Sequence, residues 1–147
     1  LAPLMGHAVA RWGERKALLF EYFGLICVFL AYGGIYLFGW GVLLAAALYI
    51  LDHMFFGLAL ALKTYFQKIA DPADIAPSAA VAFTINHISA VFLPVLLGFL
   101  WLTSPAAVFC VAAGIAALSF LLALLIPRHP QSGAETLLRP ATTAATD

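Results

Sequence analysis

Charged residues are scarce in this chain: of its 147 residues, seven are Lys or Arg and seven are Asp or Glu. They make up 10% of the sequence, whereas soluble domains average about 25%. The net charge is zero, so no basic surface for nucleic acid is expected. The composition therefore argues against a soluble globular domain and against a nucleic-acid-binding protein.

Recognisable motifs for catalysis and metal binding are also lacking. The two cysteines, Cys27 and Cys110, lie in different apolar stretches and are expected to be small buried hydrophobes, not a disulfide. No paired-Cys spacing suggests zinc, and no phosphate loop or nucleophile elbow is present. We therefore expect no enzyme activity, no metal and no cofactor. An intramembrane enzyme would have only Asp52, His53 and His87 as a catalytic set, with no nucleophile beside them.

Apolar residues, in contrast, fill 65% of the sequence and form four long stretches. Each stretch has about 20 residues or more, enough to cross a hydrocarbon core of about 30 Å as a helix. The second is expected to continue beyond the membrane on a helical pattern. The sequence predicts an all-α, polytopic membrane protein with transmembrane helices at about 17–38, 41–69, 78–102 and 106–126. Asp71-Pro72 and Ser104-Pro105 are typical starts for the last two, since Pro is tolerated in a first helical turn.

The positive charges predict the orientation. All seven basic residues lie before the first apolar stretch, after the second apolar stretch, which ends at residue 62, or after the fourth, whereas the connections at 39–40 and 103–105 have none. By the positive-inside rule, both ends of the chain are expected in the cytoplasm, with Trp40 and Trp101 at the outer interface. The basic residues are Arg11, Arg15, Lys16, Lys63, Lys68, Arg128 and Arg139.

The two ends of the chain differ in composition. Residues 1–16 begin apolar and reach charge within ten residues, so we interpret them as the end of a truncated preceding helix followed by a cytoplasmic loop. Residues 127–147 are rich in Pro, Ala and Thr and are expected to form a disordered cytoplasmic tail. A complete four-helix protein that has lost its start codon is the alternative.

The segment from Gly6 to Lys16 resembles the signature loop of the major facilitator superfamily. That pattern has Gly, a small or apolar pair, Asp, Arg, any residue, Gly, and then mostly basic positions. Ala10 stands in place of the Asp, and Glu14 in place of a basic residue. The matching residues are Gly6, Arg11, Gly13, Arg15 and Lys16. The same basic residues would also serve as simple topology signals.

This resemblance implies that the chain is a C-terminal fragment containing helices nine to twelve of a twelve-helix transporter. It implies alternating access for a small solute in an integral membrane protein, which we place in the bacterial inner membrane. The partners would be the lipid bilayer, the missing N-terminal helices, a small-molecule substrate and, as a candidate coupling ion, the proton. The alternative is a non-transporting four-helix membrane subunit or scaffold.

Polar residues within the apolar stretches are the candidate substrate or ion pathway. Asp52 and His53 fall near the middle of the second stretch, and Asn86 and His87 near the middle of the third. A charged residue at that depth costs about 2.5–3.5 kcal/mol, so such residues usually face a bundle interior or a water-filled cavity. His87 or Asn86 is therefore a possible partner for Asp52. Tyr49 and Phe56 share the helix face of this pair.

Three roles stay open for these residues: contacts that hold helices together, lining of a cavity, and proton coupling. Glu21, about one turn into the first stretch, is expected to be an interfacial carboxylate near Arg15 or Lys16. Pro94 and Gly98 in the third stretch are candidates for a helix bend, although both residue types are common in membrane helices. The fourth stretch is almost purely apolar and is expected to face lipid.

Overall fold

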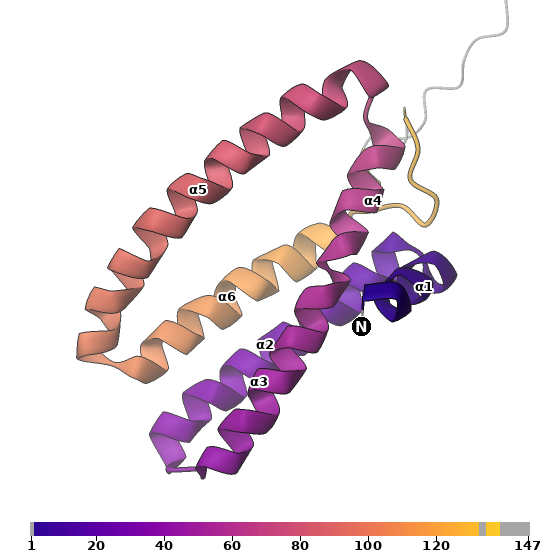
Figure 1. Cartoon of the computed structure of the whole chain (residues 1–147). Helices are drawn as coiled ribbons and strands as arrows, with labels where there is room; N and C mark the ends of the chain where they lie inside the picture. The colour runs from indigo at the N-terminus through magenta and orange to yellow at the C-terminus, as the bar shows by residue number, and fades with distance from the viewer. Residues whose placement is uncertain (1, 133–134, 139–147) are drawn as a thin grey trace, which may run out of the picture.

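The computed structural model describes residues 2–132 and 135–138, and every regular element in them is a helix. The chain folds into an open bundle in which long helices run back and forth (Figure 1). In chain order the elements are α1 (Ala2–Trp12), α2 (Glu14–Phe38), α3 (Val42–Phe56), the 3₁₀ helix η1 (Gly57–Ala59), α4 (Leu60–Ile69), α5 (Pro72–Thr103) and α6 (Pro105–Leu124).

Four of the helical segments are long and apolar enough to cross a membrane: α2, the continuous α3–η1–α4 segment over Val42–Ile69, α5 and α6. This confirms the four predicted spans. Their ends differ by a few residues, most at α5, which begins six residues before the predicted Ser78. The unpredicted feature is η1, a tight turn that starts at Gly57, a poor helix former.

Local capping explains where three helices begin or end. Gly39 adopts a left-handed φ of 69° after α2, and its N–H donates to the Ile35 carbonyl at 3.0 Å. The Asp71 carboxylate accepts from the Ala73 N–H at 2.9 Å and starts α5. The Ser104 hydroxyl accepts from the Ala107 N–H at 3.2 Å and starts α6, as predicted. Pro follows each of these two caps as the first helical residue.

Helix α2 is the centre of the bundle, and α6 packs antiparallel along it. The close approach uses small residues: Gly33 of α2 lies against the Ala106 carbonyl, and a Cβ there would be 3.7 Å from that oxygen. One face of α6 is therefore buried against α2, and the opposite face is exposed. The exposed face agrees with the expectation that this helix faces lipid, and the buried face does not. The buried residues of α6 are Ala106, Ala113, Ala116 and Ala123.

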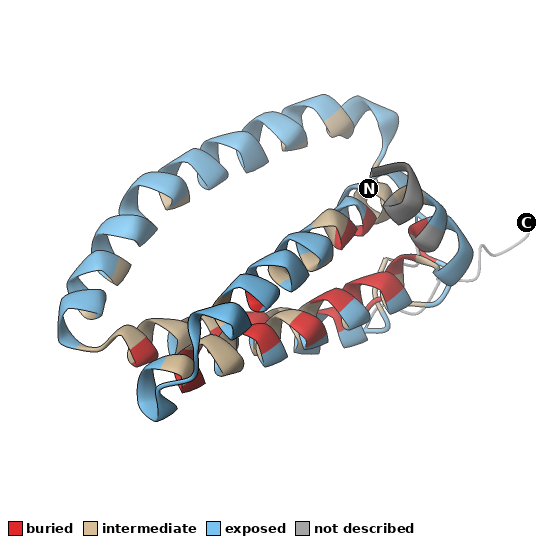
Figure 2. Ribbon diagram, turned by 60° about the horizontal axis from the view of Figure 1, so that its bottom comes forward, coloured by how far each residue is buried: buried red, intermediate tan, exposed pale blue. Residues whose placement is uncertain are grey.

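The main core lies at the end of the bundle where α1, α2, η1, α4 and the end of α6 meet (Figure 2). Gly24 of α2 lets the Phe55 ring of α3 sit directly on the α2 backbone. Tyr22, Phe55 and Tyr65 border this core. Its buried members are Val9, Ala17, Leu18, Leu58, Ala61, Ala123 and Ile126.

Helix α5 stands apart from the rest of the bundle. It packs on α6 near the short turn that joins them, and none of its residues is buried (Figures 1 and 2). It follows a bowed path and contains Pro77 and Pro94 in its interior (Figure 1). A bend at Pro94 and Gly98 in particular stays a prediction.

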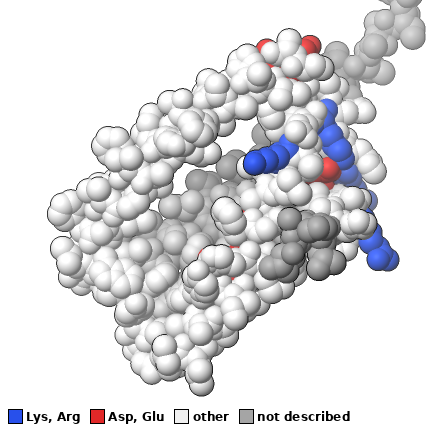
Figure 3. Space-filling model, in the orientation of Figure 1, with Lys and Arg blue, Asp and Glu red and all other residues white. Residues whose placement is uncertain are grey.

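The two short turns lie at one end of the molecule and the basic residues at the other. The Tyr36 and Trp101 rings meet edge to face at 5.4 Å beside the turns, so Trp101 lies at the same end as Trp40. On the face seen in Figure 3, the Lys and Arg side chains gather at the opposite end. This segregation is the one that the charge pattern predicts.

The described part of the C-terminal segment contacts the bundle. The Tyr65 hydroxyl donates to the Glu135 carbonyl at 2.6 Å, and the Leu137 N–H donates to the Leu125 carbonyl at 2.8 Å. Residues 135–138 therefore fold back beside α4 and the end of α6. The rest of the predicted disordered tail, at 133–134 and 139–147, lies outside the described residues.

Candidate functional site

Asp52 and His53 lie next to each other near the end of α3, close to the middle of the continuous Val42–Ile69 segment. The His53 Nδ1 is 3.8 Å from the Asp52 Oδ2 and 3.0 Å from the Tyr49 carbonyl oxygen. Because a carbonyl can only accept, this hydrogen bond requires the proton on Nδ1. The Tyr49 ring lies 4.2 Å from the imidazole and holds its orientation. Asp52 itself is near enough to Tyr32 of α2 to interact electrostatically.

His87 repeats this arrangement in the middle of α5. Its Nδ1 lies 2.9 Å from the Phe83 carbonyl oxygen, one helical turn earlier, and the two rings are 3.9 Å apart. The His87 side chain and the neighbouring Asn86 are exposed. Both histidines are thus held by their own helix, and both residues are exposed.

The structure does not bring the two polar pairs together. The suggested contact of Asp52 with Asn86 or His87 is wrong for this arrangement, because α5 packs on α6 and stands away from α3 (Figure 1). Asp52 contacts its sequence neighbour instead. Phe56, on the same helix, is 73% exposed.

The segment that resembles a signature loop is a sharp helical corner. Gly6 and Arg11 lie in α1, and Arg15 and Lys16 lie in α2. Only Gly13 breaks the helix, with a φ of 82° that glycine adopts without steric cost. The connection between the two helices is therefore shorter than the predicted segment, since good helix formers continue on both sides of one glycine.

Side chains at this corner link α2 to the ends of α6 and α4. The Arg15 guanidinium donates to the Leu124 carbonyl oxygen at 3.2 Å, which is one of the carbonyls left free at the end of α6. The Glu14 carboxylate is 2.6 Å from the Lys68 Nζ near the end of α4. Glu14 is 7% exposed and Lys68 is 53% exposed, so the carboxylate depends on this cation.

Glu21 is a buried carboxyl group that sequence reasoning placed wrongly. It is 4% exposed, its Oε2 has no hydrogen-bond partner among the described residues, and no ion pair links it to Arg15 or Lys16. Glu14 lies opposite Lys68 and Gly24 opposite Phe55, which puts Glu21 at the level of η1. The signal available in the sequence was its position between two small residues, Ala17 and Gly24, on one helix face.

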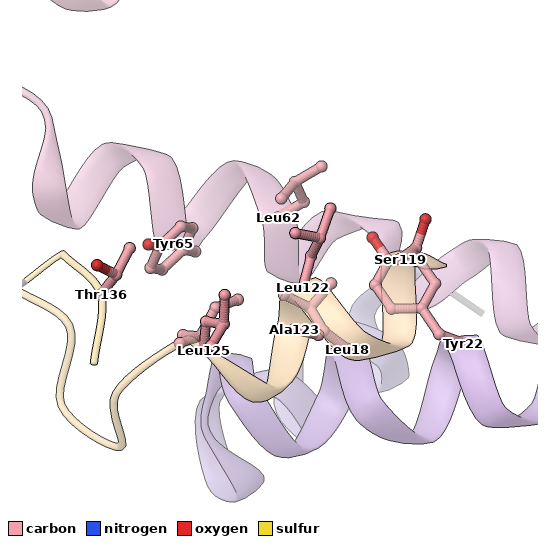
Figure 4. A pocket seen from close by; sticks show the side chains of 10 residues that line it. Leu18, Tyr22, Leu62, Tyr65, Ser119, Leu122, Ala123, Leu125 and Thr136 are labelled. Atoms are coloured by element: carbon pink, nitrogen blue, oxygen red, sulfur yellow. The ribbon is translucent and has the colours of Figure 1, made fainter. Parts of the chain in front are cut away.

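An apolar pocket of about 330 Å³ lies between α2, α4, α6 and the C-terminal segment (Figure 4). Its walls are aliphatic, with hydroxyl groups at separate places around them. In the view of Figure 4, Tyr22 and Ser119 lie toward one end of the pocket and Tyr65 and Thr136 toward the other. None of the predicted pathway residues lines this pocket.

The two cysteines are free thiols on exposed positions, so the expectation that they are buried is wrong.

Comparison with known proteins gives no relative: the chain matches no protein-family model, no curated protein and no solved structure.

Proposed function

We propose that this chain is the C-terminal part of a secondary transporter of the major facilitator type, which moves a small solute by alternating access. The observation that carries the proposal is that the polar side chains near the middle of two spans, Val42–Ile69 and α5, are partly or largely exposed. The side chains of His53 and Asp52 are 58% and 31% exposed. In lipid, an ionised group at this depth costs about 2.5–3.5 kcal/mol. Further helices or a water-filled pathway against these faces would remove that cost.

Two other features support this proposal. The 3₁₀ turn at Gly57–Ala59 interrupts the helix that carries Asp52 and His53, and such interruptions often mark hinges. The corner at Gly13 places the matching basic residues at helix ends, where Arg15 bonds to the end of α6. Binding at an interrupted helix near the bilayer midplane is common in secondary transporters.

The second candidate is a non-transporting membrane subunit, with the same polar residues serving assembly. It is favoured by one observation: both histidines bond to carbonyl groups of their own helix, so neither needs a substrate or ion.

Thiol accessibility distinguishes the two. In the intact protein with Cys27 and Cys110 replaced by Ser, we expect His53→Cys and His87→Cys to react with a hydrophilic thiosulfonate reagent. The rate should exceed that of Leu121→Cys by about tenfold or more, because the reactive thiolate forms in water and not in lipid. Leu121 is a matched control, since it is 59% exposed on the apolar face of α6.

Equal, slow reaction at all three positions would contradict a water-filled pathway and favour the assembly role. Measuring the rates by mass spectrometry of the intact protein avoids any need to know the substrate.

The proposed orientation places the two short turns outside the cell. In the same protein with its native cysteines replaced by Ser, Trp40→Cys and Ser104→Cys are expected to react with a membrane-impermeant maleimide in intact cells. Lys63→Cys, in the first half of α4, should react only after permeabilisation. Labelling of the Lys63 position in intact cells would reverse the orientation.

A further inference from the structure

Beside the corner between α1 and α2 lies a hollow of about 410 Å³ that gathers positive charge from distant parts of the sequence. Its walls come from the end of α1, the first turns of α2 and the segment after α6. Among the described residues that line it, none is acidic. We call it the cationic hollow, lined by Trp12, Arg15, Lys16, Leu19, Arg128 and His129.

The charges in the cationic hollow are not neutralised by the chain itself. In the part of the chain that the structure describes, neither Lys16 nor Arg128 has a carboxylate within ion-pair distance. Arg15 donates one bond to the Leu124 carbonyl, which fixes the guanidinium and leaves four of its N–H groups. Glu14, the acidic residue in the first turn of α2, is paired with Lys68 and does not line the hollow.

The cationic hollow opens onto an apolar surface that continues toward the membrane. Trp12 meets Phe20 edge to face at 5.9 Å. Lys16, Leu19, Phe20 and Phe23 follow one another at helical spacing on one face of α2. Phe20 and Phe23 are 52% and 58% exposed. Charge therefore lies directly above an exposed aromatic strip, at the end of the bundle where the apolar spans stop.

We propose that the cationic hollow binds the phosphate headgroup of an anionic phospholipid, whose acyl chains lie along Phe20 and Phe23. Cations at the end of the spans match the headgroup, and the exposed strip below them matches the chains. A soluble phosphate would bind to the basic side chains and would leave Phe20 and Phe23 without a contact. A protein ligand would not account for exposed aromatic residues at the depth of the lipid chains. The site is separate from the polar residues of α3 and α5, and it requires only that the chain spans a membrane.

Quenching of Trp12 fluorescence tests this proposal. The intact protein, with every other tryptophan replaced by Phe, is placed in phosphatidylcholine bilayers with increasing fractions of brominated phosphatidylglycerol or brominated phosphatidylcholine. We expect the anionic lipid to quench at a lower fraction. Lys16→Gln combined with Arg128→Gln should weaken that preference about 30-fold. The matched control is Arg11→Gln with Lys63→Gln, which removes the same charge at the same end, outside the cationic hollow, and should preserve the preference.

Equal quenching of the unsubstituted protein by the two brominated lipids would overturn the proposal, and this comparison needs no charge variant. An equal loss of preference in both double variants would also overturn it, since a general surface potential would then suffice. If inorganic phosphate at low millimolar concentration relieves the quenching, the hollow is a site for soluble phosphate and the lipid assignment fails. Failure of the transport proposal would leave all of these outcomes unchanged.

Discussion

Replacing Gly24 with Leu is expected to destabilise the protein by about 1–3 kcal/mol or more, the range for overpacking a tight contact. A Cβ at this position would fall among the ring atoms of Phe55, so the ring or the whole of α3 must move away from α2. Phe55 is also held against Phe20, with ring centroids 5.5 Å apart, which limits how far it can turn. Unfolding in mixed micelles of increasing dodecyl sulfate content measures the loss.

The matched control is Gly114→Leu on α6, where a Cβ would meet nothing within 4 Å. This change is expected to be neutral or slightly stabilising, because Leu forms helix better than Gly. Phe55→Ala in the Gly24→Leu background should recover part of the lost stability, and the double-mutant cycle gives the coupling between the two sites. Additive effects would show that the contact at Gly24 does not determine the α2–α3 packing.

The positions of the helices were predictable because the signals are local. Length and hydropathy define the spans, and the Asp71 and Ser104 caps lie within three residues of the N–H groups that they accept from. The segregation of the basic residues follows from the same count of spans, since each added helix reverses the side on which the next loop lies. These features need no knowledge of which helix touches which.

Which faces meet was not predictable. Helix α6 is apolar around its whole circumference, so no stripe indicates that its alanines face α2. The predicted contact of Asp52 with His87 failed for the same reason. It assumed that consecutive helices are neighbours along their whole length, and no polar stripe tested that assumption. In the structure, α5 packs on α6 near the turn that joins them, and the rest of α5 stands apart from the bundle.

The candidate site shows the same limit at the level of single residues. A histidine in a helix can bond to the carbonyl one turn earlier, so its polarity alone does not require a partner on another helix. The sequence also separates Arg128 from Arg15 by more than 100 residues, and only the antiparallel packing of α2 and α6 brings them into one hollow. Conversely, Glu21 looked interfacial by its distance from the start of the span, but its helix face is the one that packs.

The second large effect is expected at the ion pair that joins α2 to α4. Lys68→Met leaves the Glu14 carboxylate, which is 7% exposed, without its cation. Breaking a fully buried pair costs about 3–5 kcal/mol, and because the ammonium of Lys68 is half exposed we expect about 1–3 kcal/mol. Adding Glu14→Gln to Lys68→Met should restore most of this stability, since the buried charge is then gone as well.

Lys63→Met is the matched control for that experiment. Lys63 lies on the same helix, is exposed, and makes no ion pair among the described residues, so its replacement should change the free energy of unfolding by less than about 0.5 kcal/mol. Equal losses for the two lysines would mean that α4 needs positive charge in general, as expected for an anchor at the membrane surface. A loss confined to Lys68, and relieved by Glu14→Gln, would instead show that this single pair holds the charged ends of α2 and α4 together.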